Sequence, residues 1–206
     1  KREPSGLIAI GGDLSPERLW VAAQNGIFPW TDITAPEYAW YCPMQRFVIF
    51  PDEIHISHSM RNLINKNMYR VSIDVAFSDV IRNCSELRIH EEGAWLGEKV
   101  IQAYTKMHEL GKAHSVEVWD NEDKLVGGLY GIWIQGVFIG ESMFSLVPSG
   151  SKLALIYLAM RMQEIGGKFI DCQLETAHLK SMGGRYIPYE EYINIMWDVP
   201  KELWYK

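Results

Sequence analysis

The order of the apolar segments along the chain predicts an α+β fold, in which a sheet combines with helices behind a small N-terminal domain. Three strand-like runs follow one another from His114 to Ser145, separated only by the turn-rich joins "DNED" and "QG". A helix, a strand, a helix and a last short segment come after them, which is an α+β order. With 206 residues, 48% of them hydrophobic and 22% charged, the chain is globular and large enough for one main core.

The first part of the chain predicts a small lobe. In "LSPERLWVAAQNGIFPW", Ser15 can cap a helix, Pro16 suits the first turn and Gly26 allows the exit. The aromatic and Pro-rich stretch that follows is too irregular for a long element. We therefore expect residues 1–43 to form a small N-terminal domain and residues 44–206 to form the main domain.

The main domain opens with the strand-like run "RFVIF". In the later run "YRVSIDVAF", Val71, Ile73 and Val75 alternate with more polar residues, which predicts a half-buried strand. Helices are expected at about residues 78–87 and 98–110.

The second half supplies the sheet. The run "HSVEVWDNEDKLVGGLYGIWIQGVFIGESMFS" predicts three strands of an antiparallel meander. After it, "SKLALIYLAMRMQEIGG" predicts an apolar helix that ends at Gly166 and Gly167, and "KFIDCQ" a short strand. We expect "ETAHLKSMGG" to form a short helix and "RYIPYEEY" a final strand or turn.

Composition narrows the class of protein. No apolar run reaches the roughly 18 residues that a membrane-spanning helix needs, and the first residues lack the pattern of a secretory signal. Cys42, Cys84 and Cys172 have no CxxC spacing, so they indicate neither a disulfide framework nor a zinc site. We expect a cytoplasmic protein. Because the sequence starts at Lys1 rather than at methionine, we also expect further residues upstream.

The net charge of −6 argues against a general nucleic-acid coat, because non-specific affinity comes from Lys and Arg. The best local candidate for a basic patch is "HSMRNLINKNMYR", which holds Arg61, Lys66 and Arg70. On charge alone, a solvated helix face is the preferred interpretation of this segment.

Three apolar strands each carry one carboxylate. Side chains two residues apart share a face of a strand. This rule predicts three sets that each share one face: Ser115, Glu117 and Trp119; Ile139, Glu141, Met143 and Ser145; Phe169, Asp171 and Gln173. A carboxylate is costly to bury alone, so each must meet water, a partner or a ligand.

For Glu117 we expect a position on the solvent-exposed face of the sheet, or an ion pair with Lys or Arg. Asp171 and Gln173 flank a cysteine at a strand end, where active sites often collect, and their spacing leaves a structural and a catalytic role equally open. Met143 is more often ordinary core. Beside Glu141, however, it could form a site that holds an amine with the acid and an apolar group with the thioether.

Other motifs are absent from the sequence. The serines lack nucleophile-elbow spacing, and the six histidines show no metal-binding spacing. His114 is interpreted as a strand-edge or core histidine. The glycine pairs at 11–12, 127–128 and 183–184 do not form a phosphate-binding loop and are expected in turns and caps.

The chain resembles a known family. The segments "GLIAIGGDLSPERLWVAAQNGIFPW", "AHSVEVW", "LVGGLYGI", "GESMFS", "SKLAL", "IDCQ" and "HLKSMGG" occur in the order and spacing found in leucyl/phenylalanyl-tRNA–protein transferases. The resemblance covers nearly the whole chain. It implies an acetyltransferase-like (GNAT-like) main domain, with a mixed sheet and helices, behind a small N-terminal domain. It also implies no cofactor, no metal and no membrane partner.

The activity that the resemblance implies is transfer of leucine or phenylalanine, and less readily methionine, from aminoacyl-tRNA to proteins with N-terminal Arg or Lys. This addition marks the acceptor for degradation. The implied catalytic residues are Asp171, Gln173 and Glu141. The implied substrate-binding residues are Trp30, Trp95, Leu129, Met143, Ser145 and Ile170. The basic segment with Arg61, Lys66 and Arg70 matches the position of the family's tRNA-contacting patch.

Two alternatives remain. An acetyl-CoA-dependent small-molecule N-acyltransferase would cradle the pyrophosphate on a Gly-rich loop at a helix start, which "LVPSGSKLAL" does not supply. A non-catalytic aminoacyl-tRNA-binding module would keep the pocket without the chemistry. The presence of Asp171, Gln173 and Glu141 favours an enzyme.

Overall fold

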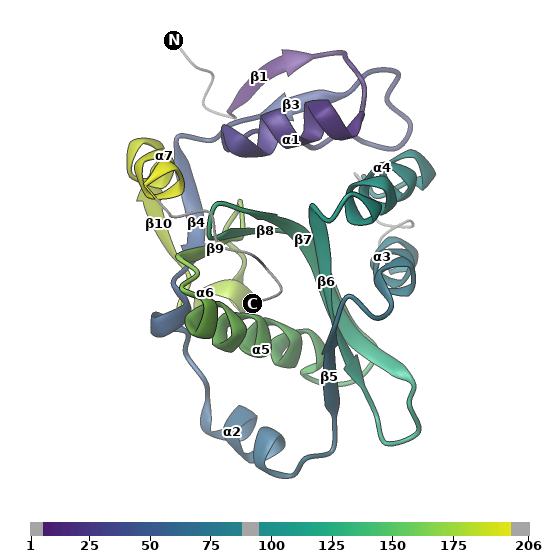
Figure 1. Ribbon diagram of the computed structural model, residues 1–206, viewed down its shortest axis with the longest axis vertical. Helices are drawn as coiled ribbons and strands as arrows, with labels where there is room; N and C mark the ends of the chain where they lie inside the picture. Colours follow the sequence, from purple (N-terminus) through teal and green to yellow (C-terminus); the bar gives the residue numbers. More distant parts are fainter. Residues whose placement is uncertain (1–5, 88–94, 199–206) are drawn as a thin grey trace.

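The computed structural model of the protein describes residues 6–87 and 95–198, and its main body is built on a seven-stranded mixed sheet (Figure 1). The strand order is β10-β4-β9-β8-β7-β6-β5. The strands are β4 (Gln45–Ile49), β5 (Arg70–Ile73), β6 (Ala113–Trp119), β7 (Leu125–Ile134), β8 (Val137–Ser145), β9 (Phe169–Asp171) and β10 (Arg185–Pro188). The expected combination of a mixed sheet with helices is confirmed. Within the described ranges, no helix has the length and apolar character needed to cross a membrane.

A second, three-stranded sheet forms what we call the N-terminal lobe, which comprises β1 (Leu7–Ile10), α1 (Pro16–Gln24), β2 (Phe28–Pro29) and β3 (Ala39–Tyr41). Pro16 begins α1 as predicted, and Gly26 leaves it with φ +64°. The side chain of Ser15 makes no capping hydrogen bond. Instead its backbone N–H donates to Asp13 Oδ1 at 2.9 Å, so an Asx turn precedes the helix.

The remaining helices are η1 (Pro51–Glu53), α2 (His58–Asn65), α3 (Phe77–Glu86), α4 (Glu98–Glu109), α5 (Gly150–Ile165), α6 (Ala177–Ser181) and α7 (Tyr189–Trp197). Most of them lie close to their predicted positions, and two of them, η1 and α7, were not predicted. The prediction of a strand or turn for "RYIPYEEY" is wrong in its second half. Pro188 ends β10 and precedes α7, whose first turn carries two glutamates that favour a helix N-terminus.

The predicted strand at residues 71–75 is too long. β5 ends at Ile73, and Asp74 adopts a left-handed conformation with φ +59°. The chain therefore turns before Val75, which is 66% exposed and takes no part in the sheet.

The meander is confirmed, because β6 pairs with β7 and β7 with β8, both antiparallel. Gly127 and Gly128 lie inside β7, so their predicted place in a turn is wrong. A Cβ on Gly127 would lie 2.8 Å from Gly150 Cα, which is too close. This glycine is needed because the start of α5 crosses the strand at that point.

A β-bulge interrupts β8 at Glu141. Tyr130 is paired with Ser142 but Gly131 is paired with Gly140, which leaves Glu141 as the extra residue. Side chains of β8 that are two residues apart across Glu141 therefore lie on opposite faces of the sheet. The prediction that Ile139 and Met143 share one face is wrong, since they pack against clusters on opposite sides of the sheet.

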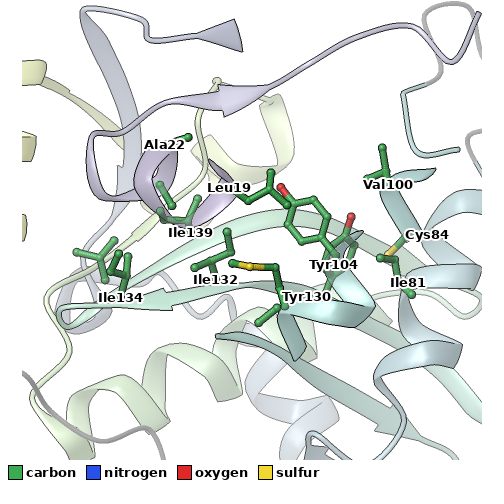
Figure 2. Packing of buried hydrophobic residues seen from close by; sticks show 14 of the residues in the cluster. Leu19, Ala22, Ile81, Cys84, Val100, Tyr104, Tyr130, Ile132, Ile134 and Ile139 are labelled. Carbon is green, nitrogen blue, oxygen red and sulfur yellow. The ribbon is translucent and has the colours of Figure 1, made fainter. Parts of the chain in front are cut away.

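Two apolar clusters cover the two faces of the sheet. The α1-side cluster joins side chains of α1, α3, α4 and α7 to the sheet. Figure 2 shows Leu19 and Ala22 of α1 above Ile132, Ile134 and Ile139. The α5-side cluster packs α5, with Met60 of α2 and Leu179 of α6, on the other face. Figure 1 shows α5 on the opposite side of the sheet from α1.

Strands β8 and β9 are the only parallel pair in the described part of the sheet, and they stay together briefly. Three residues of each are paired, and the last pair is Ile139 with Asp171. Beyond it β9 has ended, while β8 continues to Ser145 against β7 alone. The sheet therefore opens between these two strands, and the opening positions the candidate site.

Candidate active site

A cavity of about 600 Å³ lies where β8 and β9 separate. Its walls come from β8, from the segment after β9, from α5 and α6, and from the N-terminal lobe at Phe28 and Pro29. Eight of the sequence-predicted site residues line it: Trp30, Trp95, Leu129, Glu141, Met143, Ser145, Ile170 and Gln173. The fold thus brings together residues that are up to 143 positions apart in the sequence.

Much of the cavity wall is apolar. Leu129, Phe138, Leu155, Leu158 and Ile170 are buried members of the α5-side cluster, and all five reach the cavity. Such a lining favours an apolar ligand group, while a few polar groups fix its orientation.

Glu141 is one of those polar groups. The bulge places its carboxyl in the cavity wall, and burial raises its pKa to about 7. The side chains of Tyr104 and Gln173 oppose this shift, because both favour the ionised carboxylate. Glu141 can therefore change its protonation near neutral pH and, when ionised, can accept hydrogen bonds from an amine.

The side-chain amide of Gln173 lies in the cavity wall, next to the carboxyl of Glu141. The backbone of Gln173 has φ +63°, a left-handed conformation that costs a non-glycine residue roughly 1 kcal/mol. The backbone N–H of Gln173 donates to Asp171 Oδ1 at 2.8 Å, which stabilises this turn. Its side-chain Nε2 is buried and makes no hydrogen bond of ordinary geometry with the described residues. A ligand in the cavity can use it.

Asp171 does not line the cavity, and the expectation that it shares a face with Gln173 is wrong. It is fully buried, and it does not share a face with Gln173, because β9 ends at Asp171 and the chain turns. Its carboxylate accepts hydrogen bonds from Arg46 and from the Tyr192 hydroxyl, the latter at 2.9 Å. Asp171 therefore lies behind Gln173 and not beside the ligand space.

Sequence reasoning missed several groups at this site. His178 and Ser142 line the cavity, and each has a buried polar atom without a hydrogen-bond partner in the described ranges. Burial, and then the charge of Lys152, lower the pKa of His178, which favours the neutral imidazole. Both stand in segments that carry the family resemblance, Ser142 in "GESMFS" and His178 in "HLKSMGG", which was the available signal. Arg46 gave a usable signal, since it is a cation at the start of the apolar strand "RFVIF".

Glu117 lies outside the cavity lining, and both predictions for it, a solvent-exposed position and an ion pair with Lys or Arg, are wrong. It is fully buried, and it accepts hydrogen bonds from the hydroxyls of Ser72 and Ser115. Hydroxyl donors thus replace the water or the cation that we expected. His114 is a core histidine, as one of its two interpretations held, and its Nδ1 lies 2.7 Å from Asp74 Oδ2.

The three predicted tRNA-binding cations lie apart from the cavity lining. Arg61 is on α2 and Lys66 is its C-cap residue, and both side chains are exposed. Arg70 is the first residue of β5, and its side chain already interacts with Asp123 and Trp119. Its Nη2 lies 2.9 Å from Asp123 Oδ1, and its guanidinium lies 5.1 Å from the Trp119 ring centroid.

The cavity contains an amide and a carboxyl that can hold an amine, next to an apolar wall, and it lacks a serine or cysteine nucleophile paired with a base in the described ranges. Such a site suits an enzyme that transfers an acyl group by positioning two reactants, with no covalent intermediate.

Comparison with known proteins identifies the family. Residues 48–197 match the family model of the leucyl/phenylalanyl-tRNA protein transferase, and residues 12–44 match the model of its N-terminal domain. The leucyl/phenylalanyl-tRNA–protein transferase of Nitrosomonas eutropha is 47% identical over 194 residues, which cover 94% of this chain and 82% of that protein. The chain belongs to the leucyl/phenylalanyl-tRNA–protein transferase family and is an aminoacyltransferase.

A second relative agrees. The enzyme of the same name from Flavobacterium psychrophilum is 49% identical over 192 residues, covering 93% of this chain and 90% of that protein. Similarity to solved structures is more distant. L-PGS from Bacillus licheniformis superposes with a TM-score of 0.46 at 14% identity, over 78% of this chain and 51% of that one.

Proposed function

We propose that this protein transfers leucine or phenylalanine, and less readily methionine, from aminoacyl-tRNA to the N-terminal Arg or Lys of acceptor proteins, which marks them for degradation. It would act in the cytoplasm, where charged tRNA is available. The observation that carries the proposal is the apolar cavity between β8 and β9, with Glu141 and Gln173 in its wall. Family membership supports the same reaction.

The donor amino acid would place its side chain among Leu129, Met143 and Ile170. Its α-amine would then meet the Glu141 carboxylate. Trp30 and Trp95 also line the cavity and would hold the terminal adenosine by stacking, and Trp30 is 45% exposed, so its ring is accessible. Ser145 would contribute a polar contact.

The reaction is aminolysis of an ester. The acceptor nitrogen attacks the ester carbonyl carbon, the bond from that carbon to the tRNA ribose oxygen breaks, and the amine loses a proton as the ribose oxygen gains one. An N-terminal amine with an ordinary pKa of about 7.7 to 8.0 is partly neutral at cellular pH. The protein must therefore mainly hold the reactants at about 3 to 3.5 Å. Gln173 would align the amine, and Asp171 would orient Gln173.

A second cavity supports the cationic acceptor. It has a volume of about 320 Å³ and shares Pro29 and Trp95 with the first. Among the described residues, Asp32, Glu37 and Glu98 line it, together with one cation, Lys99. This acidic surplus suits the side chain of an N-terminal Arg or Lys.

Two further parts of the proposal concern organisation. The division into residues 1–43 and 44–206 is supported by the two family models, which meet between residues 44 and 48. An acetyltransferase-like fold for the second part is supported by α5, which connects β8 to the parallel strand β9 across one face of the sheet. We assign tRNA contacts to Arg61, Lys66 and, with its ion pair opened, Arg70.

The test is transfer of labelled phenylalanine from charged tRNA to a peptide. Arg- and Lys-initiated peptides should be modified, and a Glu-initiated peptide of the same sequence should not. Equal rates with both would show that the acceptor site is misassigned. Acetylation of the peptide amine from acetyl-CoA, or binding of charged tRNA without any transfer, would instead support the corresponding alternative.

A further inference from the structure

Arg46 is the centre of a buried network that reaches both walls of the donor cavity. Building on the proposed function, we propose that Arg46 and Tyr192 are positioning residues for the transfer reaction: they fix Gln173 relative to the aromatic wall of the N-terminal lobe. Arg46 is 1% exposed, and Asp171 and Tyr192 are fully buried, so none of the three can contact the ligand from solvent.

The first arm of the network runs to Gln173. Arg46 Nε lies 3.4 Å from Asp171 Oδ1, and Arg46 Nη2 donates to Asp171 Oδ2. Asp171 Oδ1 in turn accepts the backbone N–H of Gln173, at 2.8 Å. Because Gln173 is held in a left-handed conformation, this acceptor decides where its amide points.

The second arm runs to the N-terminal lobe. Arg46 Nη1 donates to the carbonyl oxygen of Gly26, and its guanidinium lies 5.1 Å from the centroid of the Phe28 ring. Phe28 lines the donor cavity, and Trp30, two residues further on, lines it too. One rigid guanidinium therefore sets the spacing between this aromatic wall and the wall that holds Gln173.

Tyr192 completes the network from α7. Its hydroxyl donates to Asp171 Oδ2 at 2.9 Å, and its ring lies 4.8 Å from the Arg46 guanidinium carbon. Asp171 then accepts four hydrogen bonds: from Arg46 Nε, Arg46 Nη2, Gln173 N and Tyr192. A carboxylate has about four acceptor positions, so all are used and none is left for the attacking amine. The role of Asp171 is to hold Gln173.

The decisive variant is Tyr192→Phe, which removes one hydrogen bond to Asp171 and keeps the ring. Tyr189→Phe is the matched control. Tyr189 also lies on α7 and donates to the Asn25 carbonyl oxygen at 3.0 Å, next to Gly26, but has no hydrogen bond to Asp171. We expect kcat to fall about tenfold in Tyr192→Phe, less than the roughly 100-fold that a 1 Å misplacement can cost because Arg46 still holds Asp171, with KM for Phe-tRNA within about twofold of the parent. Tyr189→Phe should keep the parental kcat.

A parental kcat in Tyr192→Phe, a change confined to KM, or an equal loss in Tyr189→Phe would overturn the proposal. Arg46→Lys provides a second case. A lysine keeps the charge but cannot bond both Asp171 oxygens and Gly26 together, so its kcat should fall further than that of Tyr192→Phe. Melting temperatures measured alongside separate this effect from loss of folded protein.

Hydrogen exchange of the Gln173 backbone amide, followed by NMR, tests the network without the reaction. Exchange should be faster in Tyr192→Phe than in the parent and in Tyr189→Phe. Unchanged exchange would overturn the positioning role. If the parent transfers nothing from Phe-tRNA to an Arg-initiated peptide, the proposed function fails, while this measurement still decides whether Tyr192 fixes Gln173.

Discussion

Glu141 couples the stability of the protein to pH. Its pKa rises from 4.5 to about 7 in the folded state, mainly through burial. Between these values the folded protein binds more protons at this residue than the unfolded chain does. The free energy of unfolding therefore decreases as the pH rises through this window, and the contribution of the neutral carboxyl is fully present only below about 4.5.

The first prediction follows from this coupling. In the parent, ionisation of Glu141 should lower the free energy of unfolding by about 3 kcal/mol between pH 4.5 and pH 7.5, at about 1.36 kcal/mol for each unit of pKa. Glu141→Gln should abolish this decrease. Urea unfolding of parent and variant at pH 5 and pH 8 measures it, and the variant should be the more stable protein at pH 8. Glu122→Gln, at an exposed turn, is the control and should follow the parent. Parallel pH profiles for Glu141→Gln and the parent would contradict the prediction.

The second prediction separates Asp171 from Gln173. Asp171→Ala would leave Arg46 buried without its carboxylate partner. Breaking a buried pair in this way costs about 3 to 5 kcal/mol. Gln173→Ala removes only the cavity amide and should stay within about 1 kcal/mol of the parent, because the truncated side chain borders an existing cavity and is not part of the packed core.

Both variants should lose transfer activity, but for different reasons. Denaturant unfolding and single-turnover transfer from Phe-tRNA, measured on the same preparations, distinguish them. Parental stability in Asp171→Ala would show that Arg46 finds another partner.

At the scale of elements, α2 and the start of β5 carry the proposed tRNA contacts. Arg61 and Lys66 are exposed and form no ion pair within the described ranges, whereas Arg70 is paired with Asp123. The third prediction is that replacing Arg61 and Lys66 by Ala makes the negative slope of log K against log salt less steep by about 1.8, at about 0.9 for each phosphate contact. Arg70→Ala should change it less, because Arg70 must first leave its pair.

Binding of Phe-tRNA over a range of salt concentrations measures these slopes. If the double variant keeps the parental slope, the tRNA lies on another face. The net charge of −6 would then have been the better guide to this segment.

An element could be predicted from the sequence where the residues that define it lie close together in the chain. The meander follows from alternation and turn residues that lie within a few positions of each other. The bulge at Glu141 could not be predicted in this way, because it is defined by how β8 pairs with β7. The segment "GESMFS" by itself does not show that one residue is left unpaired. For α7, the signal was present as Pro188 and two glutamates, but the apolar and aromatic residues around them were interpreted as a strand.

At the scale of the whole molecule, the N-terminal lobe and the main sheet share one core. Leu19, Ala22 and Trp40 of the lobe belong to the same buried cluster as Ile139 and Tyr192. Burial of the Arg46–Asp171 pair could not be predicted from the sequence. The two residues are 125 positions apart, and neither local segment indicates that the other is its partner. Strand spacing alone had suggested Glu141, Met143 and Gln173 as site candidates. The other five cavity residues were predicted only through the family resemblance, which carries such long-range information.

The fourth prediction is that the lobe and the main sheet unfold together. Calorimetry should give one transition with equal calorimetric and van't Hoff enthalpies. Leu19→Ala, which leaves a hole in the shared core, should lower the melting temperature of that single transition, at a cost of about 2 to 5 kcal/mol. Two transitions in the parent, or a separate early transition in the variant, would show that the lobe is independently stable.

The early end of the β8–β9 pairing also bears on how the protein avoids self-association. A strand with unpaired backbone groups on one side can recruit a strand from another molecule, and natural sheets usually block such edges with charges, prolines or covering loops. Here the unpaired side of β8, from Gly140 onwards, faces the donor cavity, whose walls are α5, α6 and the N-terminal lobe. These walls hinder a neighbouring copy from adding a strand there, so the protein keeps an open sheet edge for its substrate with less exposure to aggregation.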